Sequence, residues 1–297
     1  MDREISMNAT PKNRSFLKEL KRSAIEILDS KSNLNIKVLY EEEAIALALK
    51  YQSTLKSVYV EAMKIGVSPY RYIRNRESIS IQDQIRLAES RIAVIGSGGL
   101  GGHVLLLLAR IGIGHLRIID GDVFDETNLN RQPLCNKETI NKAKPVVAAD
   151  AVRLINPSVE VTIITEKVNV ANAEHILSGV DVIVDALDNM DDRLVVEETA
   201  KKNNIPFVHG AVAGFEGQVT TIFPEDKGLM SLYGNDRHVN DKFSPENILG
   251  VPVLAPSVIA SIQAMEVLKI LLNRGGVFRN TLVHIDLENG QLNKYEY

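Results

Sequence analysis

The 297-residue sequence contains a single cysteine, Cys135. One cysteine excludes an internal disulfide, and it excludes a zinc site built from Cys-x-x-Cys pairs. This usage fits a reducing compartment such as the cytosol. We therefore expect no structural zinc and a cytoplasmic location.

The sequence also lacks a long block of basic residues, and its formal net charge is −4. A nucleic-acid-binding surface needs clustered lysines and arginines. The arginines between residues 71 and 76 are too few to form one. We therefore expect no nucleic-acid partner.

Two further stretches argue against a membrane protein. The N-terminus, MDREISMNATPKNRS, is polar and has no signal-peptide core. The apolar run at residues 104–109 is far shorter than the roughly 20 residues that span a bilayer. We expect no membrane partner.

Apolar residues make up 45% of the chain, enough for one large or two modest domains. Apolar positions recur at helical spacing within residues 15–30 and 41–65. They predict a small N-terminal helical appendage, with packing or dimerisation as its role. We place this extension at residues 1–70 and the main domain at residues 71–297, with a polar, arginine-rich connection before residue 91.

The main domain is organised around RIAVIGSGGLGGHVLLLLARIGIGHLRIIDGD, residues 91–122. A short β-branched run is followed by Gly96, Gly98 and Gly101 in G-x-G-x-x-G spacing, and then by an apolar helical segment. The glycines let the backbone approach a phosphate closely, and the first N–H groups of the helix face the anion. The pattern predicts a nucleotide-binding unit.

Strand and helix patterns alternate from residue 91 to residue 209, which predicts a parallel sheet covered on both faces. The later strands, at residues 217–223 and 281–297, fit antiparallel pairing. The expected fold is therefore α/β, with a Rossmann-like doubly wound sheet that is parallel in its N-terminal half and antiparallel in its C-terminal half. Residues 224–253 have little periodicity and predict a crossover loop.

The glycine pattern alone is most typical of dehydrogenases that bind a dinucleotide. Hydride transfer does not explain the polar residues in the loop after the second strand, however. That loop carries Asp120, which can accept hydrogen bonds from a ribose, and a set of further charged and amide side chains: Asp122, Asn128, Arg131, Gln132, Lys142 and Lys144. Cations and amide donors at the carboxyl ends of parallel strands suit a charge that develops on phosphorus.

Four aspartates follow another buried strand: Asp185, Asp188, Asp191 and Asp192. Asp188 stands at the strand's mouth and is the best candidate to bind Mg²⁺ on the phosphates, because that ion prefers carboxylate and phosphate oxygens. The alternative for all four is a structural or helix-capping role.

Seven separated segments stand in the order and rough spacing of the ThiF/MoeB/HesA family, relatives of the ubiquitin-activating enzymes. They are VIGSGGLGG, IIDGD, NLNRQ, the lysine at 144, ALDN, GAVAGFEGQV and VLAPSVIASIQAMEVLKILL. The chain resembles this family over about residues 71–297, and the N-terminal extension lies outside the resemblance.

The resemblance implies ATP-dependent adenylylation of the C-terminal carboxylate of a small ubiquitin-like sulfur-carrier protein that ends in Gly-Gly. Gly96, Gly98, Gly99 and Gly101 would cradle the triphosphate, Asp120 would hold the ribose, and Asp188 would bind Mg²⁺. The remaining residues carried over by motif would hold the phosphates: Asn128, Arg131, Gln132 and Lys144.

The stretch Arg71-Tyr72-Ile73-Arg74 resembles the family's R-Y-x-R element. The resemblance implies that Arg74 enters the partner subunit's site, and hence that the active form is a homodimer. Asn75 stands where the family usually has glutamine, and a solvated or interfacial arginine is the alternative.

The sequence departs from many family members in lacking both the zinc-binding cysteine pairs and a catalytic cysteine in the crossover region. Cys135 is expected to be a packing residue rather than a nucleophile. Pro145 directly follows Lys144, which leaves open whether Lys142 or Lys144 reaches the phosphates. Other substrates of the same site, a peptide or a modified tRNA base, and a non-catalytic scaffold remain as alternatives.

Overall fold

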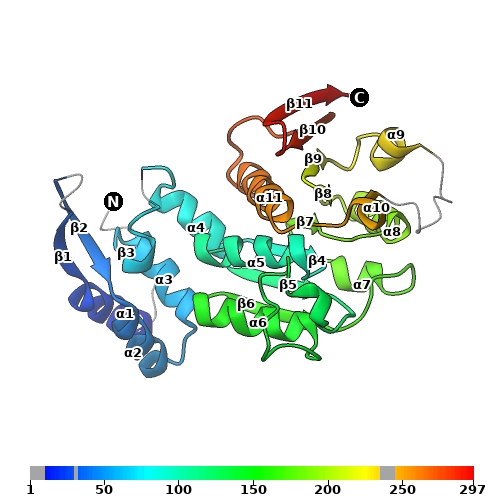
Figure 1. The fold of residues 1–297 in the computed structure, drawn as a ribbon. Coiled ribbons are helices and arrows are strands. Elements are labelled where there is room, and N and C mark those ends of the chain that lie inside the picture. The colour runs from blue at the N-terminus through cyan, green and yellow to red at the C-terminus, as the bar shows by residue number, and fades with distance from the viewer. Residues whose placement is uncertain (1–10, 30–32, 76, 235–244) are drawn as a thin grey trace. The chain divides into compact units, whose positions relative to one another are not determined.

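The computed structural model describes residues 11–29, 33–75, 77–234 and 245–297. The chain divides into two compact units, Met1–Glu89 and Ser90–Tyr297 (Figure 1). The first unit includes helix α4 (Ile81–Glu89), which lies in the segment expected to be an irregular polar connection. Its apolar side chains Ile85 and Ala88 are buried, so this segment is a short amphipathic helix.

The first unit contains a three-stranded sheet as well as helices, so the expectation of a purely helical appendage was wrong. The strand order is β1-β2-β3, with β1 antiparallel and β3 parallel to β2. Its other elements are α1 (Pro11–Ser23), β1 (Ile25–Asp29), β2 (Leu34–Leu39), α2 (Glu41–Tyr51), α3 (Leu55–Lys64), β3 (Ser68–Pro69) and the 3₁₀ turn η1 (Tyr70–Tyr72).

The expected helices failed at two identifiable places. Helix α1 ends at Ser23, and the next residues pair with β2, where Ile27 lies opposite Ile36. A short run containing two isoleucines fits the hydrophobic periodicity of a helix and that of a strand, and here the pairing with β2 favours the strand. The longer pattern breaks at Gln52, which has a left-handed backbone with φ of 53°. Thr54 then caps α3 by accepting a hydrogen bond from the Ser57 N–H.

The second unit is built on one eight-stranded sheet of order β11-β10-β9-β8-β7-β4-β5-β6, which confirms the expected doubly wound fold. Strands β4 to β8 pair in parallel, and β8 to β11 pair antiparallel. The strands are β4 (Arg91–Ile95), β5 (His115–Ile119), β6 (Glu160–Ile164), β7 (Val182–Asp185), β8 (Phe207–Ala213), β9 (Glu216–Ile222), β10 (Thr281–Asp286) and β11 (Gln291–Glu296).

Helices connect and cover these strands. They are α5 (Gly99–Ile111), the 3₁₀ turn η2 (Glu126–Asn128), α6 (Lys144–Ile155), α7 (Ala173–Leu177), α8 (Met190–Lys202), α9 (Leu229–Tyr233), α10 (Pro245–Leu249) and α11 (Leu254–Leu272). Helix α5 contacts α6 and α11, and α7 contacts α8. Helices α9 and α10 lie within the expected crossover loop, and residues 235–244 are outside the described residues.

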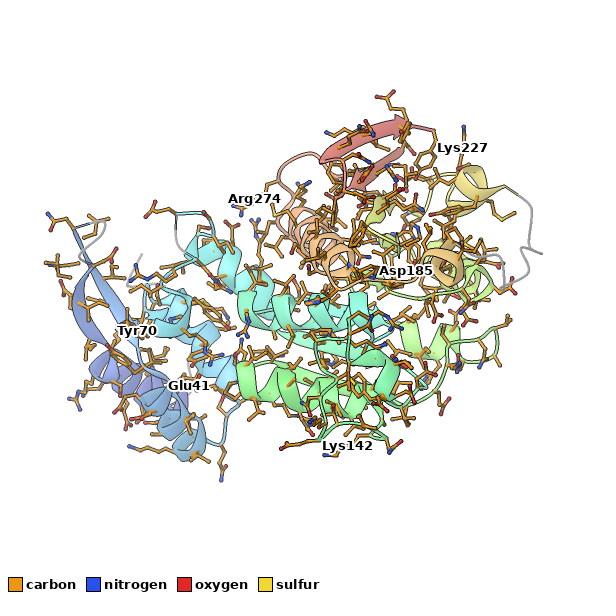
Figure 2. All side chains as sticks on the ribbon, in the orientation of Figure 1. Glu41, Tyr70, Lys142, Asp185, Lys227 and Arg274 are labelled. Atoms are coloured by element: carbon orange, nitrogen blue, oxygen red, sulfur yellow. The ribbon has the colours of Figure 1, made fainter. Side chains whose placement is uncertain are left out.

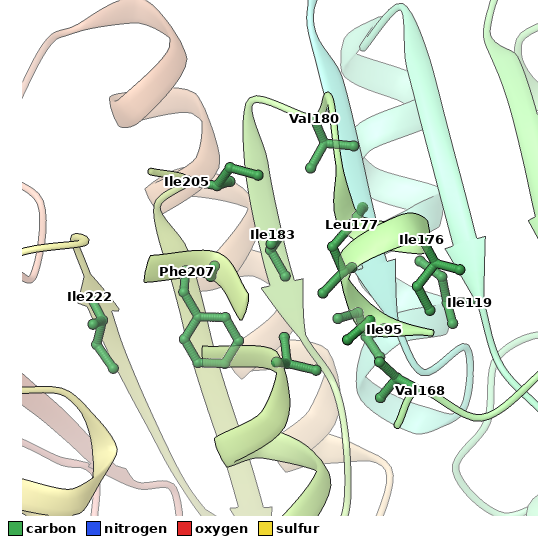
Figure 3. Close-up of a cluster of buried hydrophobic side chains, with 14 of the residues drawn as sticks. Ile95, Ile119, Val168, Ile176, Leu177, Val180, Ile183, Ile205, Phe207 and Ile222 are labelled. Carbon is green, nitrogen blue, oxygen red and sulfur yellow. The ribbon is translucent and has the colours of Figure 1, made fainter. Parts of the chain in front are cut away.

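A cluster of buried aliphatic side chains joins α7 and α8 to the sheet (Figure 3). Phe207 on β8 and Ile183 on β7 are almost completely buried in it. A fully buried side chain of this size stabilises a fold by about 1.5–3 kcal/mol relative to exposure. The cluster therefore fixes the strands whose carboxyl ends carry the polar residues described below.

Helix α11 is 19 residues long and has a mean hydropathy of 1.5, so length and composition alone would allow a membrane span. Its side chains nevertheless serve the interior of this unit. Gln263 and Glu266 are completely buried within it and bond to neighbouring strands and loops. A helix that packs on β8, β9 and α5 in this way does not indicate a membrane protein.

Candidate active site

The glycine turn between β4 and α5 has a backbone that only glycine allows. Gly96 has φ of 93°, and a Cβ there would lie 2.5 Å from the Ala186 carbonyl oxygen. A Cβ on Gly101 would lie 1.9 Å from the carbonyl oxygen of Gly96. These contacts bring α5 against the end of β4, and the helix presents its first N–H groups there. The turn has the shape of a phosphate cradle.

Asp120, at the end of β5, is fastened to this turn. Its carboxylate accepts hydrogen bonds from the Ser97 N–H at 2.7 Å and the Ser97 hydroxyl at 3.0 Å, and from the Asp122 N–H at 2.9 Å. The carboxylate thereby holds the glycine turn and the start of the next loop together. This anchoring role was not expected from the sequence, which assigned Asp120 only to a ribose.

A cavity of about 690 Å³ opens at the carboxyl ends of β4, β5 and β7. It is large enough for a nucleotide. Nine of the expected site residues line it: Gly96, Gly98, Gly99, Asp120, Asp122, Arg131, Gln132, Lys144 and Asp188. Residues far apart in the chain are thus gathered at one site, as the strand order requires.

Gly101 and Asn128 are not among the residues that line the cavity. Gly101 acts through its close packing on Gly96. Asn128 is buried, and its side-chain oxygen accepts a hydrogen bond from the Asp125 N–H at 3.1 Å, which caps η2. In this structure Asn128 supports the loop that carries Arg131 instead of facing the cavity.

Arg131 and Gln132 form one wall. The Arg131 guanidinium donates to the Thr127 carbonyl oxygen and to the Asn130 side-chain oxygen, both at 2.9 Å. Gln132 is 7% exposed and lies beside Gly98, and its buried side-chain oxygen has no hydrogen-bond partner among the residues that the structure describes. A buried amide in this state can complete its hydrogen bonds with a ligand in the cavity.

Lys144 stands at the start of α6 and is 8% exposed. Its ammonium lies 3.3 Å from one oxygen of Asp122, and the ammonium of Lys167 lies 3.5 Å from the other. Burial alone would raise the pKa of Asp122, but the two lysines outweigh burial and lower it. Asp122 therefore holds two cations at the cavity wall, one buried and one exposed.

The choice between the two sequence candidates at this helix follows from their positions. Lys144 lines the cavity, whereas Lys142 is exposed, does not line it and points outward from the unit (Figure 2). Pro145 occupies the first turn of α6, where its missing N–H is tolerated. The proline therefore starts the helix and does not displace Lys144.

Asp188 is exposed in the loop between β7 and α8 and lines the cavity. Asn189 caps α8 by accepting from the Asp192 N–H, and its amide also donates to Asp192. Asp192 thus belongs to the cap, which leaves Asp188 as the more accessible carboxylate. Among the described residues, no three His, Cys, Asp or Glu side chains are grouped to hold a metal by themselves.

Arg74 belongs to the first unit, and Cys135, in the second unit, does not line the cavity. Arg74 is exposed in the first unit, just after η1, while Arg71 pairs with Glu41 at 2.6 Å. The Cys135 thiol donates to the Asp125 carbonyl oxygen at 3.6 Å, and burial raises its pKa. A raised pKa disfavours the thiolate that a nucleophile needs.

Two basic residues of the cavity lining were missed by the sequence interpretation. Lys167 follows the carboxyl end of β6, and the loops at the carboxyl ends of parallel strands line the ligand site, so the same reasoning would have identified it. Arg193 is 5% exposed and stands on α8, where nothing in its sequence neighbourhood distinguishes it from a solvated helix residue.

The donor set fits ATP with Mg²⁺. The glycine turn offers a backbone cradle, and Arg131, Lys144 and Gln132 offer charge and donors in the same cavity. The apolar side chains Ile95 and Leu187 also line the cavity and can contact a base. Mg²⁺ would be held by Asp188 together with phosphate oxygens, because that ion usually takes few protein ligands.

Comparison with known proteins relates the chain to one family. The model of the ThiF family matches residues 71–297. The SAMP-activating enzyme E1 of Haloferax volcanii is 34% identical over 220 residues, which are 73% of this chain and 80% of that enzyme.

A second relative is longer than this chain. The Arabidopsis thaliana protein named adenylyltransferase and sulfurtransferase MOCS3 is 34% identical over 265 residues, covering 86% of this chain and 56% of that protein. Among solved structures, the crystal structure of E. coli MccB with ATP superposes with a TM-score of 0.67 at 18% identity, covering 85% of this chain and 82% of MccB. At this identity the likeness shows the fold alone.

Proposed function

Because the chain belongs to the ThiF family, we propose that it uses ATP to adenylylate the C-terminal carboxylate of a small ubiquitin-like sulfur-carrier protein. The observation that carries the proposal is the placement of Arg131 and Lys144 on the wall of a cavity that begins at a glycine cradle. The names of the relatives, an E1 and an adenylyltransferase, support it.

The reaction joins two anions. A carboxylate oxygen of the carrier forms a bond to the α-phosphorus of ATP, the bond from that phosphorus to the bridging oxygen breaks, and pyrophosphate leaves with the electron pair. The carboxylate is already ionised at neutral pH, so no general base is needed. What the site must supply is positive charge and hydrogen-bond donors aimed at the phosphates.

The residues of this chain divide that work. Arg131 and Lys144 would neutralise the phosphate charge, and the side chain of Gln132 would bond the phosphates or the ribose. Asp122 holds Lys144 at the wall, so the ammonium is in place before ATP arrives. Asp188 would bind Mg²⁺, which spreads the charge of the departing pyrophosphate when bound.

We further propose that the carrier ends in Gly-Gly, as the resemblance to the ThiF/MoeB/HesA family implies. The active form would be a cytoplasmic homodimer in which Arg74 reaches the partner's site. The exposure of Arg74 leaves its side chain available for such a contact. An arginine supplied in trans contributes on the order of 10³-fold in phosphoryl transfer.

Pyrophosphate–ATP exchange tests the function. Purified protein with a Gly-Gly-ended carrier should exchange labelled pyrophosphate into ATP, and a carrier amidated at its C-terminus should abolish exchange while leaving the rest of the carrier unchanged. Exchange that proceeds without any carrier, or that fails with every carrier and peptide carboxylate, would refute the proposal.

Subunit mixing tests Arg74 separately. Arg74→Ala and Lys144→Met are each expected to be nearly inactive, and mixing them forms dimers with one complete site if Arg74 acts in trans. Random pairing should then restore about a quarter of the wild-type activity. No recovery on mixing, with exchange of subunits verified, would place Arg74 in cis or outside the site.

A further inference from the structure

A buried polar network lies directly beneath the loop that carries Asp188. Strand β7 pairs with β4 as far as Asp185, but its pairing with β8 ends at Val184 and Val208. Asp185 and His209, the next residues on these two strands, are both completely buried. Figure 2 shows Asp185 in the interior of the second unit. Their side chains contact each other just beyond the last paired residues.

Asp185 is held from several sides. Its carboxylate accepts from the Leu187 N–H at 2.9 Å and lies 2.6 Å from Nδ1 of His209. Its carbonyl oxygen accepts from the amide of Gln263 at 2.8 Å. The Arg193 side chain lies 3.4 Å from the same carboxylate and donates to the Leu187 carbonyl oxygen. The backbone of Leu187 is therefore fixed at both its N–H and its carbonyl group.

The proton positions in this network follow from burial. Burial lowers the pKa of His209, and the nearby Asp185 offsets only part of that effect, which favours the neutral ring. Because Asp185 only accepts, Nδ1 must carry the proton and donate it. Nε2 then accepts from the Tyr233 hydroxyl at 2.9 Å, and the Tyr233 oxygen accepts from the Gln218 amide at 2.7 Å.

The network connects the cavity to helix α9. Ala186, Leu187, Asp188 and Asn189 all line the cavity, and Tyr233 is the last residue of α9. The other end of α9 is also anchored, because the Leu229 N–H donates to the buried Glu197 at 2.9 Å. The loop and the helix are therefore parts of one hydrogen-bonded assembly.

We propose that His209 and Tyr233 are positioning residues: acting through Asp185, they hold loop 186–189 in the conformation that binds Mg-ATP. The inference rests on the proposed function for its ligand, and on the hydrogen bonds described above for its geometry. Neither residue lines the cavity, so both act through another group.

Tyr233→Phe is the decisive variant, since it removes one hydroxyl and leaves His209 Nε2 without its donor. We expect the Kd for Mg-ATP, measured by calorimetry, to rise about three- to tenfold, the loss that one hydrogen bond represents. Amide exchange at Leu187 should accelerate in the same variant, because its N–H depends on Asp185.

Tyr297→Phe is the matched control. The Tyr297 hydroxyl bonds Thr220 at 2.9 Å in the same unit, and among the described residues no hydrogen bond joins it to loop 186–189. We expect it to lower thermal stability while leaving the Kd for Mg-ATP and Leu187 exchange unchanged. A Tyr233→Phe protein with wild-type Kd, or equal effects of both variants on Kd, would overturn the inference.

His209→Asn adds a rescue test, because an asparagine amide can donate to Asp185 where leucine cannot. Its Kd should lie closer to the wild-type value than that of His209→Leu, and equal values would count against positioning. If the wild-type protein binds Mg-ATP but exchanges no pyrophosphate, the proposed function alone fails, because binding and amide exchange still test the network.

Discussion

Replacing Lys144 with methionine should separate catalysis from stability. Methionine keeps a similar shape at a position that is 8% exposed but removes the charge. A cation about 4 Å from a phosphate charge at an effective dielectric constant of about 20 contributes about 4 kcal/mol. Losing it should lower the rate of carrier adenylylation about 10³-fold.

The stability cost should be small by comparison. The partner Asp122 has a side chain that is 47% exposed and retains Lys167, and such pairs contribute about 1 kcal/mol or less. Single-turnover AMP transfer and urea unfolding measure the two effects. Lys142→Met is the control: this lysine is exposed outside the cavity and should leave both unchanged. Equal activities of the two variants would refute the assignment of Lys144.

Three further predictions concern the metal, the glycine turn and the acid side of the pH profile. Asp188→Asn should raise the Mg²⁺ concentration for half-maximal activity at least about tenfold. Asp191 is exposed and does not line the cavity, so Asp191→Asn should leave that concentration unchanged. Identical Mg²⁺ titrations of the two variants would refute Asp188 as a metal ligand. Gly101→Ala should lower the free energy of unfolding, measured in urea, by about 1–3 kcal/mol and abolish ATP binding, because the new Cβ would lie 1.9 Å from a carbonyl oxygen. Gly276→Ala is the control: its Cβ meets open space, so the change should be neutral. The pKa of Asp122 is lowered on folding, so its contribution to stability is present above its unfolded pKa of about 4 and is lost as the pH falls through the folded value. Asp122→Asn should therefore be less stable than wild type at pH 7. A stability difference that persists at pH 2 would contradict this.

Much of the second unit could be predicted because its signals are local. The β-branched run before Gly96, the glycine spacing and the apolar helix after it determine one strand, one turn and one helix. Because the carboxyl ends of parallel strands lie at one edge of the sheet, the sequence predicts that Asp120, Arg131 and Lys144 lie close together, and all three line one cavity.

The missed features depend on tertiary contacts. The run after Ser23 became strand β1 because β2 was available to pair with it. The Asn128 side chain accepts from the Asp125 N–H instead of facing the cavity, because the turn of the loop brings these two residues together. His209 is one polar residue in an apolar strand, and its link to Asp185 and Tyr233 follows only from the separation of β7 and β8.

The most direct test of the central claim follows an oxygen atom. A Gly-Gly-ended carrier labelled with ¹⁸O in its terminal carboxylate is incubated with the protein and Mg-ATP, and the acyl-adenylate is cleaved with hydroxylamine at its carbonyl carbon. Attack on the α-phosphorus predicts one ¹⁸O in the phosphate of the released AMP and none in pyrophosphate. Unlabelled AMP, or label in inorganic phosphate, would contradict the account.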